Sequence, residues 1–285
     1  GLDCANGSAW ALAKTVFDAL GAQVRCIGVS PDGTNINAEC GSTRPERLCE
    51  LVRLHSLDLG FAFDGDADRC ICVDERGEVV DGDGILWVCA KDMHERGELG
   101  GGGVVTTVVS NGGLARALAR SGGLCTRTQV GDKYVAEEMA RRGALLGGEP
   151  SGHIVFRKYA TTGDGILTAL RVAEIVLERK CPLSFLTRGY VPLPQKKRDV
   201  PVPGGAAILE REDVRAAIAR AQGEDVRMVV RASGTEPVVR ILAEGDEAAA
   251  EGALRLVERA VRAAAEELCC AGSSAIWGQS APRPV

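Results

Sequence analysis

The chain has 285 residues, of which 45% are hydrophobic and 26% are charged, and its formal net charge is −5. These values are typical of a globular protein with two or three domains. The negative charge argues against a nucleic-acid-binding protein, which carries a basic surface, and no apolar run approaches the roughly 18 residues that a membrane span needs. We therefore expect neither a nucleic-acid nor a membrane partner.

The eleven cysteines are scattered and show no pair with the spacing of a zinc site. Cys26, Cys70, Cys72 and Cys89 lie in apolar runs that are typical of a core. This distribution indicates reduced, buried thiols. Together with the absence of a visible signal peptide, it predicts a cytoplasmic protein.

The first third of the chain alternates between strands and helices. The turn signal Asn6-Gly7 precedes the first predicted helix, Gly21 ends it, and Arg76-Gly77 marks a hairpin. Alternation of this kind predicts a parallel sheet with crossover helices, in which ligands bind at the carboxyl ends of the strands. We expect strands at residues 23–29, 57–63, 70–74 and 78–80, and helices at residues 9–20, 45–55 and 81–96.

An acidic segment follows the strand predicted at residues 57–63. Asp64, Asp66 and Asp68 are separated by Gly65 and Ala67, so in a looping backbone their carboxylates point the same way. Two such charges about 4 Å apart repel by roughly 4 kcal/mol at an effective dielectric constant of about 20. Three of them need a cation. Oxygen ligands without His or Cys favour Mg²⁺, then Ca²⁺, over Zn²⁺.

Two other interpretations of the acidic segment compete. Asp64, Asp66, Asp68 and Glu75 match four ligand positions of an EF-hand. Arg69 stands where that loop needs Gly, however, and the flanking segments are predicted strands rather than helices. A solvated acidic turn is the second alternative, since Asp-Gly turns are common. The buried-strand context and the Arg directly after the acids favour the metal loop.

A glycine-rich run at residues 97–103 is the first predicted domain boundary, and the alternation then starts again. The loop that follows residues 145–146 contains Glu149, Ser151 and His153, whose side chains suit hydrogen bonding to a polyol. A plain Gly/Pro turn, with His153 as a structural histidine, is the alternative. We expect strands at residues 103–109, 124–129, 145–146 and 154–156, and helices at 114–120, 131–142 and from about 166 to 180.

The last third begins with a proline-punctuated linker and an edge strand at residues 191–202. Strands at 226–230 and 238–243 then enclose a loop that suits a phosphate, because a guanidinium, hydroxyl groups and a glycine backbone all favour an anion. An ordinary hairpin turn is the alternative. Helices are expected at 210–222 and 247–268, followed by a disordered tail at 269–285. The candidate phosphate-binding residues are Arg231, Ser233, Gly234, Thr235 and Arg240.

Three motifs in this order resemble those of the α-D-phosphohexomutases, and within them the bacterial glucosamine branch. They are the segment Asp64-Gly-Asp-Ala-Asp-Arg69, the segment Gly148-Glu-Pro-Ser-Gly-His153 and the segment Arg231-Ala-Ser-Gly-Thr-Glu-Pro237. Further similarity to the glucosamine branch lies at residues 33–37, 40–43, 129–132 and 161–165. The resemblance covers residues 1–268.

The resemblance implies an α/β fold with two successive mixed α/β domains and a C-terminal α+β phosphate-binding domain. In the family numbering these are domains 2, 3 and 4 of four around a central cleft. We place domain 2, truncated at its start, at residues 1–97, domain 3 at 98–190 and domain 4 at 191–268.

The resemblance also implies an activity, the interconversion of glucosamine 6-phosphate and glucosamine 1-phosphate for cell-wall precursor synthesis. A phosphoserine donates its phosphoryl group, and a bisphosphate intermediate turns over in the cleft. A hexosamine phosphate is then the expected partner, and a homodimer is left open. The implied roles are Mg²⁺ binding by Asp64, Asp66 and Asp68, support of phosphoryl transfer by Arg69, substrate binding by Glu149, Ser151 and His153, and phosphate binding by Arg231, Ser233, Gly234, Thr235 and Arg240.

One departure from the family pattern is large. The family's serine is followed by His and Asn, and no serine here precedes a His. Because residues 1–4 also read as a strand already under way, we expect the first domain and its nucleophile to be missing and this chain to be inactive alone. A phosphomannomutase or phosphoglucomutase of the same fold, a non-catalytic sugar-phosphate-binding fragment and a Mg²⁺-dependent phosphatase remain as alternatives.

Overall fold

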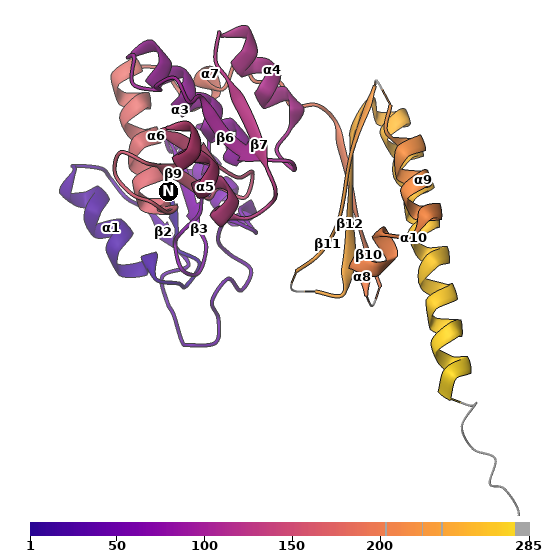
Figure 1. The fold of residues 1–285 in the computed structure, drawn as a ribbon. Coiled ribbons are helices and arrows are strands. Elements are labelled where there is room, and N and C mark those ends of the chain that lie inside the picture. The colour runs from indigo at the N-terminus through magenta and orange to yellow at the C-terminus, as the bar shows by residue number, and fades with distance from the viewer. Residues whose placement is uncertain (203, 224, 235, 277–285) are drawn as a thin grey trace, which may run out of the picture. The chain divides into compact units, whose positions relative to one another are not determined.

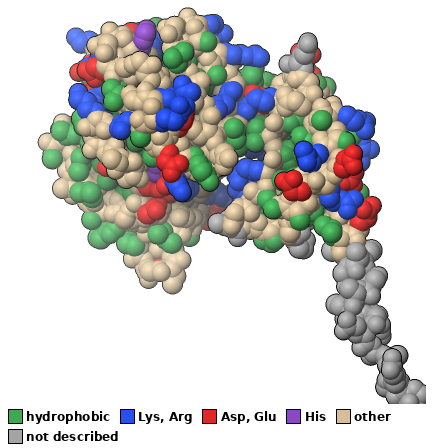
Figure 2. Space-filling model, viewed as in Figure 1, with side chains coloured by type: hydrophobic (Ala, Val, Ile, Leu, Met, Phe, Trp, Pro, Cys, Tyr) green, Lys and Arg blue, Asp and Glu red, His purple; other side chains and the backbone are tan. Residues whose placement is uncertain are grey.

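The computed structural model describes residues 1–202, 204–223, 225–234 and 236–276. The chain divides into two compact units, Gly1–Pro192 and Leu193–Val285, and each is described by itself (Figure 1). The mixed α/β class predicted from the sequence is confirmed. Among the described residues, none of the helices is long and apolar enough to cross a membrane. On the face shown in Figure 2, Lys and Arg side chains are scattered among Asp and Glu side chains.

The first sheet of unit 1 has five strands in the order β2-β1-β3-β4-β5. Its first three strands are parallel, as the strand–helix alternation predicts, and the last two run antiparallel as a hairpin. The strands are β1 (Leu2–Asp3), β2 (Cys26–Ile27), β3 (Gly60–Phe63), β4 (Cys70–Val73) and β5 (Val79–Val80), and the crossover helices are α1 (Ala9–Ala19) and α2 (Glu46–His55).

The second sheet of unit 1 has the order β7-β6-β8-β9. Strands β6, β7 and β8 are parallel, and β9 returns antiparallel to β8. The strands are β6 (Val104–Thr107), β7 (Cys125–Thr128), β8 (Leu146–Gly148) and β9 (Ile154–Phe156). The helices are α3 (Gly82–Glu95), α4 (Gly112–Arg120), α5 (Asp132–Arg142), α6 (Gly165–Arg179) and α7 (Leu183–Leu186).

The two sheets share one hydrophobic core. Phe63 of β3, Leu86 of α3 and Leu146 of β8 are all buried in the same cluster. Helix α3 is buried on most of its surface because it contacts helices α4 and α6 as well as strands β4 and β8. This arrangement fixes the carboxyl end of β3 relative to the carboxyl end of β8, and the acidic segment and the Glu149 loop follow these two strand ends.

Unit 2 is an antiparallel sheet in the order β10-β12-β11 with helices packed against it. Strand β10 (Gln195–Pro201) is the predicted edge strand, and β11 (Val226–Ala232) pairs with β12 (Val238–Gly245). The helices are α8 (Gly205–Leu209), α9 (Glu212–Ala221) and α10 (Glu247–Ile276).

The predicted end of the last helix at Leu268 is wrong, because α10 continues to Ile276. Residues 269–276 therefore continue the helix, where the sequence had indicated the start of a disordered tail. Once a helix is nucleated, each added residue gains a hydrogen bond, and no proline interrupts the chain before Pro282. Residues 277–285, the rest of the predicted tail, lie outside the described residues.

A buried carboxylate joins α3 to the loop before α4. Asp83 is 1% exposed, and its Oδ2 accepts a hydrogen bond from the backbone N–H of Asn111 at 2.7 Å. Its other oxygen, Oδ1, has no hydrogen-bond partner among the described residues. Burial raises the pKa of Asp83 to about 7, with a further contribution from the charge of Asp81. The ionised form is therefore disfavoured in the folded chain.

We expect Asp83 to make the stability of unit 1 depend on pH. Asp83 keeps its proton in the folded protein up to about pH 7, whereas in the unfolded chain it loses the proton near pH 4. Its contribution to the free energy of unfolding is therefore full below pH 4 and is lost as the pH rises through 7. A rise of the pKa of this size corresponds to a loss of roughly 4 kcal/mol in the free energy of unfolding. Urea unfolding from pH 4.5 to 8 should show this loss in the wild type and not in Asp83→Asn. The exposed Asp18→Asn is the control, and equal pH dependence in all three proteins would contradict the assignment.

Candidate metal and sugar-phosphate site

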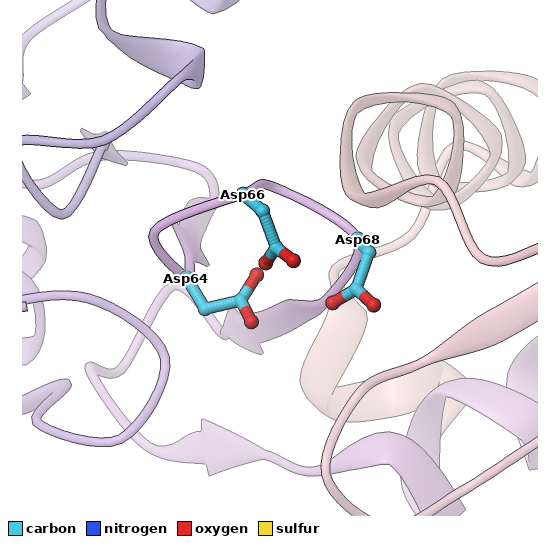
Figure 3. A group of neighbouring side chains, drawn as sticks. All are labelled: Asp64, Asp66 and Asp68. Carbon is cyan, nitrogen blue, oxygen red and sulfur yellow. The ribbon is translucent and has the colours of Figure 1, made fainter. Parts of the chain in front are cut away.

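The three predicted metal ligands lie together in the turn between β3 and β4. One carboxylate oxygen each from Asp64, Asp66 and Asp68 lies within 4.8 Å of the others. Figure 3 shows the carboxylates of Asp64 and Asp66 pointing toward one another, with that of Asp68 lying across from them. Asp64 is buried, Asp66 is exposed and Asp68 is partly buried. The turn therefore presents three oxygen donors to a single point that solvent can reach.

The backbone of this turn is held by its own hydrogen bonds. Ala67 adopts a left-handed conformation with φ of 61°, and its N–H donates to the carbonyl of Asp64 at 3.1 Å. The N–H of Arg69 donates to Oδ1 of Asp64 at 3.1 Å. A Cβ on Gly65 would lie 2.6 Å from the side chain of Ile36, so the glycine allows the loop at residues 33–37 to approach the acidic turn.

The charges of the turn are only partly compensated by protein groups. The Nε of Arg69 lies 3.4 Å from Oδ2 of Asp64 and 3.4 Å from Oδ1 of Asp68. Burial raises the pKa of Asp64 to about 6, and the nearby Asp68 adds to this effect. Oδ1 of Asp68 is buried and has no hydrogen-bond partner among the described residues. The crowded oxygens, one of them unpartnered, suit a hard divalent cation.

The loop with Glu149, Ser151 and His153 connects β8 to β9 in the same unit. Oε1 of Glu149 accepts a hydrogen bond from the N–H of Gly131 at 3.1 Å, and Ser151 is exposed. His153 is 4% exposed, and both ring nitrogens have protein partners. Its Nδ1 lies 3.2 Å from Oδ2 of Asp68, and its Nε2 accepts the N–H of Gly163 at 3.1 Å. The structure thus brings this loop to the acidic turn.

Backbone hydrogen bonds also join the two loops and helix α3. The N–H of Cys70 donates to the carbonyl of Gly152 at 3.0 Å, and the N–H of Gly82 donates to the carbonyl of Pro150 at 3.1 Å. A Cβ on Gly82 would lie 2.0 Å from the carbonyl oxygen of Glu149. The sequence analysis missed Gly82 and Gly163 as residues that position the site. A glycine directly before or inside the first turn of a helix is the available signal, because helix interiors disfavour glycine.

The predicted phosphate-binding residues lie on the β11–β12 hairpin of unit 2. Arg231 and Arg240 are directly opposite each other on the paired strands. The side chain of Arg240 forms an ion pair with Glu236 and lies 3.5 Å from Asp199. The N–H of Ser233 donates to the carbonyl of Val238 at 2.9 Å, which closes the hairpin.

Because Arg231 and Arg240 are register partners, their side chains leave the same face of the hairpin, and two positive side chains on one face favour an anion. Gly234 lies in the same turn, and nothing within 4 Å would meet a Cβ there. Thr235 lies outside the described residues.

Three family models match the chain in order. They are the phosphoglucomutase/phosphomannomutase alpha/beta/alpha domain II at residues 1–77, the alpha/beta/alpha domain III at residues 81–192 and the C-terminal domain at residues 190–261. The chain therefore belongs to the phosphoglucomutase/phosphomannomutase family, the phosphohexomutases, as the motifs predicted. Helix α3, which we had placed in the first domain, falls within the residues matched by the domain III model.

The chain is similar in sequence to curated phosphoglucosamine mutases. It is 55% identical over 247 residues to the phosphoglucosamine mutase of Lachnospira eligens, covering 86% of this chain and 55% of that protein. It is 48% identical over 267 residues to the phosphoglucosamine mutase of Caulobacter vibrioides, covering 92% of this chain and 59% of that protein. The chain thus spans little more than half the length of the curated relatives that it matches.

Solved structures share the fold. A phosphoglucomutase/phosphomannomutase family protein from Burkholderia thailandensis has a TM-score of 0.76 at 26% identity, covering 92% of this chain and 60% of that one. The Aspergillus fumigatus N-acetylphosphoglucosamine mutase, solved in complex with GlcNAc-6P and magnesium, has a TM-score of 0.77 at 23% identity, covering 93% of this chain and 61% of that one.

We expect Gly82→Ala to destabilise unit 1 by about 1–3 kcal/mol, because the added methyl group must displace the Glu149 loop or helix α3. Gly101→Ala is the matched control, since nothing within 4 Å would meet its Cβ. Urea unfolding of both variants measures the difference. Equal stability of the two variants would show that the loop does not pack on Gly82 as described.

Proposed function

We propose that this chain forms the metal-binding and sugar-phosphate-binding part of a phosphoglucosamine mutase. The proposed reaction interconverts glucosamine 6-phosphate and glucosamine 1-phosphate through a phosphoserine and a bisphosphate intermediate. The observation that carries the proposal is the joining of the acidic turn to the Glu149 loop, by His153 and Asp68, in a chain about half identical to phosphoglucosamine mutases.

The acidic turn fits Mg²⁺ in the proposed site. Asp64, Asp66 and Asp68 supply only oxygen ligands, and the free Oδ1 of Asp68 gains a partner when a cation binds. The magnesium in the Aspergillus fumigatus complex supports this choice of ion. When bound, the ion neutralises charge on the carboxylates and on the phosphoryl group being transferred.

The remaining residues bind and orient the substrate in this proposal. Arg69 lies beside the acidic turn and is positioned to stabilise negative charge on the phosphoryl oxygens. The carboxylate of Glu149, fixed through Oε1 by Gly131, and the exposed hydroxyl of Ser151 bind sugar hydroxyls. On unit 2, the loop with Arg231, Ser233, Gly234, Thr235 and Arg240 binds the phosphate that does not react.

The phosphoryl-carrying serine is not assigned to a residue of this sequence. None of its serines precedes a His, whereas the family's serine is followed by His and Asn. We infer that the 285 residues bind substrate and metal but do not turn over by themselves.

A phosphomannomutase or phosphoglucomutase activity is the second candidate. The description of the matching family models names both of these activities. The phosphoglucosamine mutases at 48–55% identity favour the amino sugar. Cytoplasmic location and a place in cell-wall precursor synthesis belong to this proposal as well.

We expect Mg²⁺ or Mn²⁺ to stabilise the chain through the acidic turn. At a metal concentration about 100 times the Kd, binding adds roughly 2.7 kcal/mol and raises Tm by several degrees. Asp66→Asn should abolish this increase and, because it removes one repelling charge, should leave the metal-free Tm unchanged or higher. The exposed Asp58→Asn should behave as the wild type. A metal-induced increase that survives Asp66→Asn would place the ion elsewhere.

A coupled assay for glucosamine 1-phosphate tests the proposed reaction. We expect no turnover by the chain alone, and turnover with Mg²⁺ once a phosphoserine domain of the family is joined ahead of Gly1. Glucose 6-phosphate and mannose 6-phosphate are the comparison substrates, and faster turnover of either would favour the second candidate. Turnover by the chain alone would contradict our assignment of the nucleophile. No turnover in either folded protein would favour a sugar-phosphate-binding fragment without catalysis.

A further inference from the structure

A row of buried polar side chains connects helix α3 to the end of strand β8. Asp83, Thr106 and Ser110 are all buried. The hydroxyl of Thr106 donates to the carbonyl of Gly148 at 2.8 Å and also bonds to the hydroxyl of Ser110. The hydroxyl of Ser110 in turn bonds to the carboxyl group of Asp83. These contacts, the Asp83 network, connect Asp83 to the residue directly before Glu149.

The carbonyl of Gly148 fixes the direction of the hydrogen bonds in the Asp83 network. A carbonyl oxygen only accepts, so the single hydrogen of the Thr106 hydroxyl points to Gly148. Thr106 must then accept from Ser110, and this bond uses the single hydrogen of the Ser110 hydroxyl. Toward Asp83, Ser110 can therefore only accept. The carboxyl group of Asp83 has to be the donor, which requires that it carry a proton.

The surroundings of Asp83 favour the protonated form. Burial raises its pKa to about 7, and the negative charge of Asp81, the N-cap of α3, adds to the rise. The backbone N–H of Asn111, the hydroxyl of Ser110 once the carboxyl group is ionised, and the guanidinium of Arg127 on β7 act in the opposite direction. The carboxyl group therefore carries its proton below about pH 7 and loses it as the pH rises further.

Ionisation of Asp83 breaks the network at its other end. An ionised carboxylate only accepts, so the hydrogen of the Ser110 hydroxyl turns to Asp83 and no longer reaches Thr106. Two hydroxyl oxygens in contact with no hydrogen between them repel each other, so the hydroxyl of Thr106 turns toward Ser110. The carbonyl of Gly148 then loses its donor. Because a buried carbonyl without a partner is unfavourable, the end of β8 is no longer held in this position.

The loop that carries Glu149 lies between this strand end and α3. A Cβ on Gly82, the residue before Asp83, would lie 2.0 Å from the carbonyl oxygen of Glu149. The N–H of Gly82 donates to the carbonyl of Pro150 at 3.1 Å. Helix α3 therefore holds one side of the loop, and Gly148 holds the other. A shift at Gly148 changes the position of the Glu149 carboxylate.

We propose that Asp83 is a positioning residue that holds the Glu149 loop in place through Ser110 and Thr106 while it carries a proton, and that releases the loop when it ionises. The inference rests on the proposed function in one respect, the binding of sugar hydroxyls by Glu149. It makes the affinity for the sugar phosphate depend on the proton of a buried group that acts through other residues.

Carbonyl ¹³C and amide ¹⁵N chemical shifts, measured from about pH 5.5 to 9, test the Asp83 network. We expect the carbonyl of Gly148 and the amide nitrogen of Glu149 to shift with the same midpoint as the side-chain carboxyl carbon of Asp83. Asp83→Asn should abolish both shifts, because its amide group donates to Ser110 at every pH. Cys125 of β7 is close enough to sense Asp83, but burial raises the pKa of its thiol, which stays neutral over this range.

Thr106→Val removes the link to Gly148 and keeps the shape of the side chain. Asp83 should still titrate in this variant, and the carbonyl of Gly148 should no longer follow it. The exposed Thr15→Val is the matched control and should behave as the wild type. A Gly148 carbonyl that does not titrate in the wild type, or that titrates equally in Thr106→Val, would overturn the proposal. The wild type and Asp83→Asn decide the question even if Thr106→Val does not fold.

Binding of glucosamine 6-phosphate to the chain in the presence of Mg²⁺ separates this inference from the proposed function. The ligand itself titrates in this range, so the informative quantity is the ratio of the Kd of the wild type to that of Asp83→Asn. We expect this ratio to rise by about 2–10-fold between about pH 6 and 8.5, the effect of one lost hydrogen bond. A constant ratio would contradict the positioning of Glu149 by Asp83. Absence of binding by both proteins would contradict the proposed function, and the carbonyl shifts would still decide the Asp83 network.

Discussion

Three carboxylates crowded into one short turn are the constraint on which this site depends. Their ligand atoms lie within 4.8 Å of one another, at the carboxyl end of a buried strand where water is only partly available to screen them. The protein offsets the repulsion with the guanidinium of Arg69, the backbone N–H of that residue and the ring of His153. Burial, with a smaller contribution from the charge of Asp68, raises the pKa of Asp64, so the ionised form of this carboxylate is disfavoured. In the function that we propose, a cation completes the arrangement.

The surrounding fold keeps this turn in place from several sides. Strand β3 and strand β8 end near one another because both sheets of unit 1 share the core that contains Phe63, Leu86 and Leu146. Close packing transmits small displacements across such a core. The glycines at positions 82, 152 and 163 then let backbone approach backbone between the loops, where any Cβ would collide. The acidic turn and the loop that carries Glu149 are therefore packed directly against each other within unit 1.

The sequence predicted the parts of the structure that depend on local pattern. Strand–helix alternation gave the parallel strands of both sheets, and the spacing of Asp64, Asp66 and Asp68 indicated their convergence. It could not predict that His153 would bond to Asp68, because 85 residues separate them in the chain and only the shared core brings them together. The end of α10 was misjudged because weak helix formers do not stop a helix that has already formed.

The candidate phosphate-binding residues of the β11–β12 hairpin show the same difference between what local sequence and what distant strand pairing determine. The turn residues and flanking strands of the hairpin followed from the pattern around Gly234. The ion pairs of Arg240 with Glu236 and Asp199 depend on strand pairing, and Asp199 lies on a strand distant in sequence. An anion that binds there has to compete with these acidic partners, which the sequence analysis did not anticipate.

Anomalous diffraction from crystals of this chain grown with Mn²⁺ tests the central claim most directly. The account predicts a single strong peak bounded by carboxylate oxygens of Asp64, Asp66 and Asp68, with Oδ1 of Asp68 as a ligand and Oδ2 still bonded to His153. A peak elsewhere, or an Asp68 carboxylate turned away from His153 to reach the ion, would contradict it.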